Sequence, residues 1–217
     1  MANFDMKKFL MELIKFNTDS VTKANYTECA EFIHKTALEL GLKSEILTTT
    51  TDGDKPCPNV VITKEGKKEG ATILLVTHFD IVPAGEGWSY DPFEPFEKDG
   101  KIFGRGASDD KGAIAAALAA MVEMKEPLNT FKLLATSDEE VGGKGIDYLF
   151  NEVKIPGDFA IVLDSGPDQL TIGASGILFG KILVYGKQGH TGYPFRSINA
   201  IDEARKILDI IDTVSYT

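Results

Sequence analysis

The chain has 217 residues, of which 43% are hydrophobic and 26% are charged, and its formal net charge is −10. The negative charge and the lack of any basic run argue against a nucleic-acid or anionic-membrane surface. The apolar stretches are too short to span a membrane, and the N-terminus lacks the apolar region and cleavage site of a signal peptide. Cys29 and Cys57 are too few for a disulfide framework, so we expect a reduced, cytoplasmic protein.

The first half of the chain predicts two amphipathic helices and two strands. Apolar residues recur at helical spacing over residues 4–16 and 26–41, and Gly41 would end the second helix. Residues 59–65 and 71–78 are strand-like, and the polar, glycine-containing segment between them predicts a hairpin-type turn. This half therefore predicts a helical pair followed by the first strands of a sheet.

The middle of the chain predicts an α/β sheet interrupted by one long loop. Residues 82–106 are rich in Pro, Gly and aromatic residues and show no helical period, and a loop of that length is usually functional. A helix at 110–126, a strand at 131–136, a helix near 143–153 and a strand at 159–164 follow. This alternation predicts a largely parallel mixed sheet with helices on both faces.

The sequence changes character after the last of these strands. Residues 171–187 are punctuated by glycines and predict an antiparallel strand pair, and residues 199–212 predict a helix. Two strands and one helix cannot bury both of their faces. We therefore expect a catalytic domain at residues 1–175 and the beginning of a smaller α+β domain at 176–217.

Residue types that bind metals follow three of the predicted strands and precede one of the helices. These residues are His78, Asp80, Asp109, Glu139, Glu140 and Asp164. Catalytic residues of α/β proteins collect at the carboxyl ends of the strands, where the connecting loops converge. Buried acidic groups that face one another are costly unless a cation neutralises them. The pattern therefore predicts a metal site, of the kind used by two-metal hydrolases.

A structural role is the alternative for each motif taken alone. His78 and Asp80 are two residues apart on a strand, so their side chains share a face, and Asp80 could accept the second N–H of a ligating imidazole. The alternative is a surface histidine beside a solvated carboxylate. Asp109 and Asp110 precede a helix, where either of them, or Ser108, could cap the first N–H groups.

The glutamate pair also has two interpretations. Adjacent strand residues face opposite ways, so Glu139 and Glu140 reach one site only if the chain has turned, and Gly142 and Gly143 suit such a turn. One carboxylate would then bind metal while the other acts as a general base. The alternative is a solvated acidic loop. His190, a lone loop histidine between glycines, would by itself be structural or exposed.

Three motifs in order give a family resemblance. The segments HFDIVPAGEGWSYDPFEPFEKDGKIFGRGASDDKG, TSDEEVGGKG and QGHTGYP resemble those of the co-catalytic zinc amidohydrolases. That family includes aminoacylase, acetylornithine deacetylase, succinyl-diaminopimelate desuccinylase, carboxypeptidase G and the dipeptidases. The resemblance covers essentially the whole chain and implies a zinc-peptidase-like catalytic domain followed by a lid and dimerisation domain.

The resemblance implies a metal-binding role for four residues. His78 and Asp164 would bind one ion. Glu140 would bind the other, and Asp109 would bridge the two. The same resemblance implies a cis peptide bond between Asp109 and Asp110. Zinc is the expected ion, and cobalt or manganese could substitute because one imidazole among several carboxylates is a fairly hard ligand set.

The resemblance also implies catalytic roles for three residues. Asp80 would orient His78, and Glu139 would be the general base. His190 would belong to the lid and help to hold the scissile carbonyl oxygen, often across a homodimer interface. The implied activity is hydrolysis of amide bonds in short peptides or N-acyl amino acids, and the DDKG form at Asp110 slightly favours dipeptidases and carboxypeptidases.

One departure from the family allows several interpretations of this chain. Its members continue beyond the lid and supply a late histidine beside Glu140, whereas this sequence ends at Thr217. The sequence could be a fragment, its remainder could be a separate chain, or it could be a naturally shortened relative. We expect the 217-residue chain alone to have little activity. The alternative function is a truncated, non-catalytic module that binds a metal or ligand. Retention of Glu139 favours the enzyme, since a binding module needs no unliganded carboxylate there.

Overall fold

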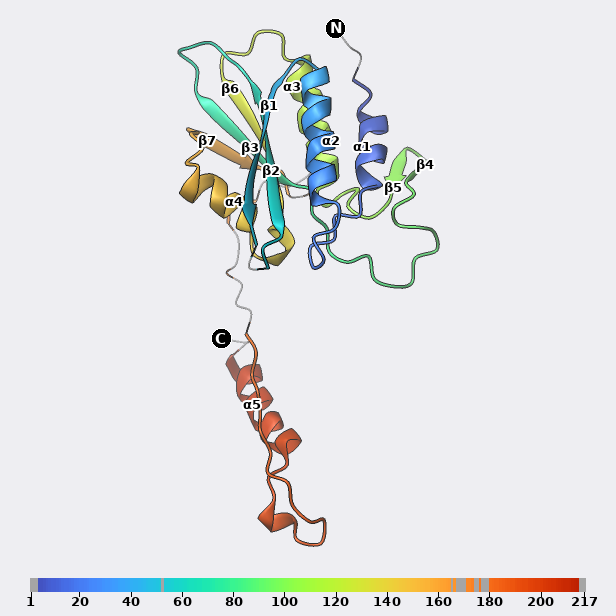
Figure 1. The fold of residues 1–217 in the computed structure, drawn as a ribbon, viewed down its shortest axis with the longest axis vertical. Coiled ribbons are helices and arrows are strands. Elements are labelled where there is room, and N and C mark those ends of the chain that lie inside the picture. The colour runs from blue at the N-terminus through green and yellow to red at the C-terminus, as the bar shows by residue number, and fades with distance from the viewer. Residues whose placement is uncertain are drawn as a thin grey trace. The chain divides into compact units, whose positions relative to one another are not determined.

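The computed structural model describes residues 4–51, 53–164, 166, 171–173, 176 and 180–214. The chain forms two compact units, Met1–Leu170 and Thr171–Thr217 (Figure 1). The sequence places its domain boundary at 175/176, close to this division.

The first unit contains the predicted alternation of helices and strands. Its helices are α1 (Met6–Ile14), α2 (Tyr26–Glu39), α3 (Lys111–Glu123) and the short α4 (Lys144–Asp147), which continues as a π-helical turn at Tyr148–Glu152. Its strands are β1 (Lys43–Thr50), β2 (Pro56–Lys64), β3 (Thr72–His78), β4 (Phe96–Lys98), β5 (Lys101–Phe103), β6 (Thr130–Thr136) and β7 (Phe159–Val162). In the part of the chain that the structure describes, no helix has the length and hydrophobicity to cross a bilayer.

Five strands form a mixed sheet in the order β1-β2-β6-β3-β7. Strands β3, β6 and β7 are parallel to one another, and β1 and β2 join antiparallel at one side. The predicted hairpin between β2 and β3 is wrong, because β6 lies between them and pairs with both. Strand β1, which the sequence analysis missed, is the true hairpin partner of β2.

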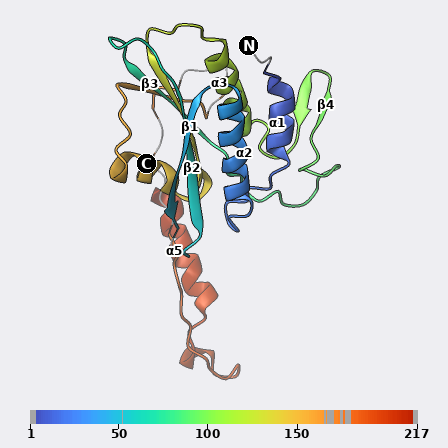
Figure 2. The same cartoon turned by 45° about the horizontal axis from the view of Figure 1, so that its top comes forward.

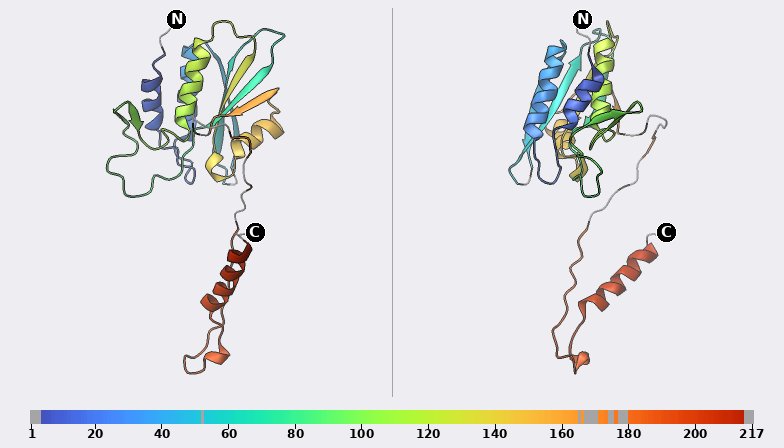
Figure 3. Two further views of the ribbon diagram at one scale, coloured as in Figure 1. Left: turned by 180° about the vertical axis from the view of Figure 1, so that it is seen from behind. Right: turned by 90° about the vertical axis from the view of Figure 1, so that its right-hand side faces the viewer.

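Helices cover both faces of this sheet, which confirms the predicted fold class (Figures 1 and 2). On one face, Leu13 of α1, Ile33 of α2 and Leu118 of α3 pack with Ile62 and Leu133 of the sheet, and all five are fully buried. The view from behind in Figure 3 shows α3 on this same side.

The opposite face carries a smaller core. Val61, Leu74 and Leu134 point to this side and pack against Leu149 of the π-helical turn that follows α4. Val61 lies between two residues that face the larger core, as the alternation of a strand requires. The centre of strand β2 is therefore buried on both faces, which explains why residues 60–62 are three consecutive apolar residues.

The long loop at 82–106 is partly ordered by its own aromatic residues. It contains the β4–β5 hairpin, which the sequence analysis did not predict. Tyr90 packs edge-on against Phe96 and Trp88, and Phe96 stacks on Phe103 with ring centroids 5.2 Å apart. The loop is therefore a small packed unit between β3 and α3.

The second unit contains α5 (Ala200–Val214) where the sequence predicts a helix. The predicted strand pair at 171–187 lies partly outside the described residues. Residues 180–186 form no strand, and Lys187 makes an isolated antiparallel bridge with Ile198. In the first unit, Cys29 and Cys57 are free and buried, as expected.

Gly106 lies at a point where the backbone closely approaches the side chain of Ile81. Its φ is +81°, and a Cβ at this position would lie 2.8 Å from the Ile81 side chain. Gly87 has φ +88° with open space around it. We expect Gly106→Ala to lower the free energy of unfolding by about 1–3 kcal/mol more than Gly87→Ala, because both strain the backbone but only Gly106→Ala overpacks the turn. Urea denaturation measures both, and equal losses would contradict this account.

Candidate metal centre

The parallel register of three strands brings the predicted ligands to one edge of the sheet. His78, the last residue of β3, pairs with Thr136, the last residue of β6. On the other side of β3, Val76 pairs with Val162 of β7. Asp164 lies two residues beyond Val162 and is therefore level with His78. The sequence prediction that these strand ends meet is correct because the three strands run in the same direction.

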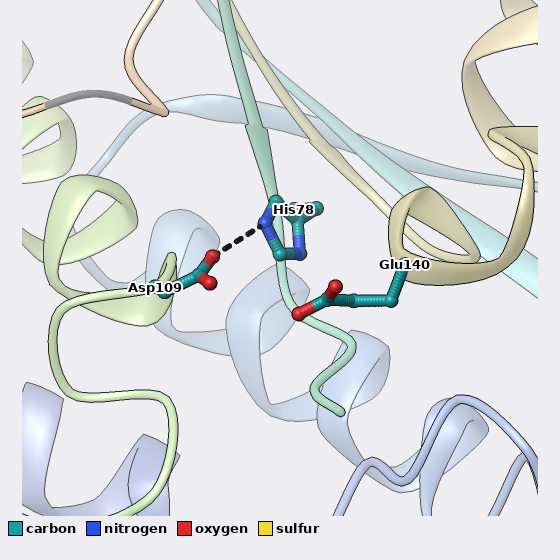
Figure 4. Close-up of side chains that lie close together, drawn as sticks. All are labelled: His78, Asp109 and Glu140. Carbon is teal, nitrogen blue, oxygen red and sulfur yellow. Dashed lines mark hydrogen bonds and ion pairs between the residues drawn. The ribbon is translucent and has the colours of Figure 1, made fainter. Parts of the chain in front are cut away.

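His78 is buried, and its two ring nitrogens face different partners. Nδ1 lies 3.0 Å from the backbone carbonyl of Asp80 and 3.4 Å from its carboxylate. Nε2 lies 3.1 Å from Oδ1 of Asp109 (Figure 4). A histidine that ligates a metal through one nitrogen usually donates its other N–H to a carboxylate or carbonyl. The imidazole therefore presents Nε2 to the acidic cluster with its tautomer set by Asp80.

Asp80 has a second set of contacts that the sequence analysis did not anticipate. Its carboxylate is fully buried and accepts the backbone N–H groups of Glu139 and Glu140, each at 3.1 Å. A single side chain therefore fixes both the imidazole after β3 and the glutamate turn after β6. The spacing of His78 and Asp80 could suggest the first contact but not the second.

The glutamates lie on a turn, as the sequence analysis required for both to reach one site. Asp138 adopts the left-handed conformation, with φ +70°, and Glu139–Val141 form a single turn of 3-10 helix. Gly142 and Gly143 then have φ +123° and +72°. The change of direction immediately after β6 allows adjacent residues to face the same place.

Asp109 and Asp110 are joined by the cis peptide bond that was expected from the resemblance. Asp110 occupies the N-cap position of α3, but its side chain makes no capping hydrogen bond. Its buried carboxylate instead accepts the backbone N–H of His78 at 3.2 Å. For Asp110 the capping interpretation is therefore wrong, and the residue links the start of α3 to the end of β3.

Two groups of side chains are close enough to hold metal ions. Ligand atoms of His78, Asp109 and Glu140 all lie within 4.8 Å of one another, and so do those of His78, Glu139 and Asp164. Figure 4 shows the carboxylates of Asp109 and Glu140 directed toward the imidazole. The carboxylates of four residues, Asp109, Glu139, Glu140 and Asp164, thus converge on His78.

The electrostatics of the cluster reflect its concentration of acidic groups. Burial raises the pKa of Glu139 and of Glu140, and the charges of Asp109 and Asp80 raise both further, while His78 opposes the shift. Burial also raises the pKa of Asp110, to about 7. Burial by itself lowers the pKa of His78, but the hydrogen bond and charge of Asp80, together with the charges of Asp110 and Glu139, outweigh it and raise that pKa to about 10.

These residues fit a divalent cation by the chemistry of their donors. One imidazole nitrogen and four carboxylates are ligands that zinc, cobalt and manganese accept. The carboxylates repel one another, and this repulsion contributes to the raised pKa values of Glu139 and Glu140. A bound cation would offset that repulsion directly.

His190 lies in the second unit. Its Nδ1 accepts the backbone N–H of Gly192 at 3.0 Å, and its ring lies 5.9 Å from that of Tyr193. These contacts are all within residues 171–217, so the lid role of His190 stays a prediction.

The fold and the site define an α/β domain with a histidine and several carboxylates at the carboxyl ends of its parallel strands. The sequence matches the family model described as Peptidase family M20/M25/M40 over residues 74–208, more than half of the chain. The protein therefore belongs to this family, and the resemblance drawn from the motifs is confirmed.

Similar proteins include succinyl-diaminopimelate desuccinylases. The one from Nitratiruptor sp. is 40% identical over 149 residues, which are 64% of this chain and 41% of that protein. The one from Zymomonas mobilis is 36% identical, covering 80% of this chain and 48% of that protein. The chain thus spans about two fifths to one half of the length of these curated relatives.

Solved structures agree on the fold. The M20 family metallo-carboxypeptidase Sso-CP2 from Sulfolobus solfataricus has a TM-score of 0.65 and 26% identity, covering 76% of this chain and 39% of that one. A tripeptidase from Staphylococcus aureus has a TM-score of 0.68 at 21% identity, covering 94% of this chain and 55% of that one. The second likeness supports the fold alone.

Proposed function

We propose that the protein is a metal-dependent hydrolase that cleaves amide bonds of short peptides or N-acyl amino acids. The observation that carries this proposal is the arrangement around His78. Its Nε2 faces Asp109, its Nδ1 is held by Asp80, and ligand atoms of His78, Asp109 and Glu140 lie within 4.8 Å of one another. Family membership supports the same class of reaction.

The proposed ligands are divided between two ions. His78 and Asp164 would hold one, Glu140 would hold the other, and Asp109 would contact both. Zinc is the proposed ion, and cobalt or manganese would substitute. When bound, the ions would supply Lewis acidity toward the scissile carbonyl and the attacking water. The proximity of these side chains to His78 supports the ligand set, and the division between two ions rests on the family resemblance.

Glu139 is proposed as the general base. Its carboxylate would accept a proton from the attacking water and return it to the leaving amine. Burial and the neighbouring carboxylates raise its pKa, which makes the oxygen a better proton acceptor than an exposed carboxylate. Because both glutamates lie near His78, the division of roles between Glu139 and Glu140 is part of the proposal.

The remaining proposals concern the second unit, the oligomeric state and the cellular location of the protein. Residues 176–217 would begin a lid and dimerisation domain, in which His190 helps to hold the substrate carbonyl. We propose a homodimer formed through this domain, and a cytoplasmic location. A shift of the dimer equilibrium on deletion of α5, measured by sedimentation, would support the dimer.

A hydrolysis screen tests the reaction class. The full-length protein is incubated with zinc, cobalt or manganese and with dipeptides, N-acetyl amino acids and N-succinyl amino acids. We expect metal-dependent release of free amino groups from one of these classes, abolished by a chelator. Saturable metal binding with no hydrolysis of any class would favour a non-catalytic binding module instead.

Asp109→Ala tests the proposed bridging position separately from turnover. Since one residue would serve both ions, its loss should reduce both the affinity and the stoichiometry of metal binding, measured by calorimetric titration with zinc. Glu94→Ala, which removes one exposed carboxylate from the long loop, is the control for lost negative charge. Full stoichiometry and unchanged affinity in Asp109→Ala would contradict the bridging role.

A further inference from the structure

The carboxylate of Asp138, beside the candidate base, is held by a separate buried ion pair. The residue is 4% exposed. Its Oδ1 forms an ion pair with Nζ of Lys23 and accepts the hydroxyl of Tyr26 at 3.1 Å. The side chains of Lys23 and Asp138 are only 11% and 6% exposed. A buried ion pair with a hydrogen-bonded phenol holds its side chains in one geometry, whereas an exposed surface pair contributes little.

The segment that supplies Lys23 is itself fixed to the end of β3. Residues 15–25 connect α1 to α2. Within them, the N–H of Ser20 donates to the carbonyl of Ile81 at 2.9 Å, and the N–H of Ile81 donates to the carbonyl of Thr18 at 3.0 Å. The Lys23 ammonium therefore has a set position relative to the strand that carries His78.

The glutamate turn is consequently held at two points. On the inner side, the carboxylate of Asp80 accepts the N–H groups of Glu139 and Glu140. On the outer side, Asp138 is held by Lys23, and its own carbonyl accepts the N–H of Gly143, which closes the turn. The left-handed backbone of Asp138 is an uncommon conformation for a residue other than glycine and needs such support.

We propose that Asp138, with Lys23 and Tyr26, is a positioning group that sets the orientation of Glu139 and Glu140. The three residues act through the backbone of the turn and touch neither substrate nor reacting atoms. The proposed effect of these residues on the backbone of the turn does not depend on whether the protein has enzymatic activity. Its catalytic consequence rests on the proposed function.

Hydrogen exchange of single amides, followed by NMR, tests the positioning directly. Lys23→Met removes the cation, whereas Lys23→Arg keeps it, and both retain a long side chain at a residue with φ +58°. In Lys23→Met we expect the protection of the Glu139 and Glu140 amides to fall by about 10- to 100-fold, since a buried carboxylate loses its partner. The amides of β6 should keep their protection, and Lys23→Arg should restore most of the loss at the glutamates.

Two further variants complete the comparison. Lys43→Met removes an exposed lysine that pairs with Glu65 and should leave every measured amide unchanged. Tyr26→Phe removes one hydrogen bond and should give a smaller loss at the same two amides, which keeps the test available if Lys23→Met does not fold. Equal loss of protection in β6 and in the turn, or no loss at the glutamates in either variant, would overturn the proposal.

An activity measurement separates this proposal from the proposed function. If the protein hydrolyses amides, Lys23→Met should lower kcat by about tenfold or more with little change in KM, since the base is misplaced while the binding surface is kept. An unchanged kcat alongside lost amide protection would overturn the catalytic consequence. Full-length wild-type protein without hydrolytic activity would overturn the proposed function and leave the exchange result to decide the positioning.

Discussion

In a complete enzyme, Glu139→Gln is expected to lower kcat by about 10²–10⁴-fold while the protein retains its metal ions. A neutral amide cannot accept a proton from the attacking water and therefore cannot return one to the leaving amine. The loss could exceed this range because one residue serves both half-steps. KM should change far less, since the missing interaction matters chiefly in the transition state.

Glu140→Gln is the matched comparison, because it makes the same chemical change one residue along the same turn. If Glu140 is a ligand, this variant should lose metal affinity as well as turnover. Calorimetric titration with zinc and steady-state kinetics on both variants distinguish the two roles. Loss of metal in Glu139→Gln with retention in Glu140→Gln would reverse the assignment of base and ligand.

The sequence could predict which residues meet because the relevant geometry is local to each strand end. His78 and Asp164 each lie at the carboxyl end of an apolar run, and parallel strands place such ends together. The turn that carries Glu139 and Glu140 could be predicted from the two glycines that follow it. Each of these inferences needs only a few neighbouring residues.

Strand pairing could not be predicted in the same way. The polar segment between β2 and β3 has the composition of a hairpin turn, yet β6 lies between the two strands. The pairing of Val61 with Leu134 and of Leu75 with Leu133 joins residues far apart in the chain. Turn composition reports local backbone preference and carries no information about such distant partners.

The supports of the site were missed for a related reason. Nothing in the motif around Asp110 indicates that its carboxylate accepts the N–H of His78 rather than capping α3. The ion pair of Lys23 with Asp138 joins a loop before α2 to the turn after β6. From the sequence alone, a lysine or aspartate outside any motif is predicted to lie on the surface, and only the fold shows that it is buried.

Asp80→Asn is expected to disturb both halves of the candidate site at once. The carboxylate accepts backbone N–H groups from Glu139 and Glu140 and faces Nδ1 of His78. An asparagine of the same shape offers one oxygen and an NH₂ group, so one backbone N–H would face another donor. Leaving a buried donor unpaired costs about 1–3 kcal/mol. The loss of a carboxylate beside a ligating histidine typically weakens metal binding by about 10–100-fold.

Asp158→Asn is the control for this substitution. Its carboxylate also accepts a backbone N–H, that of Thr72 at 2.7 Å, but it is exposed and lies at the opposite end of β3. We expect Asp158→Asn to leave zinc affinity unchanged and Asp80→Asn to lower both zinc affinity and the protection of the Glu139 and Glu140 amides. Because one carboxylate makes both sets of contacts, the two losses must appear together. Weakened zinc binding with fully protected amides would mean that Asp80 supports only the imidazole, and the reverse result would mean that it supports only the turn.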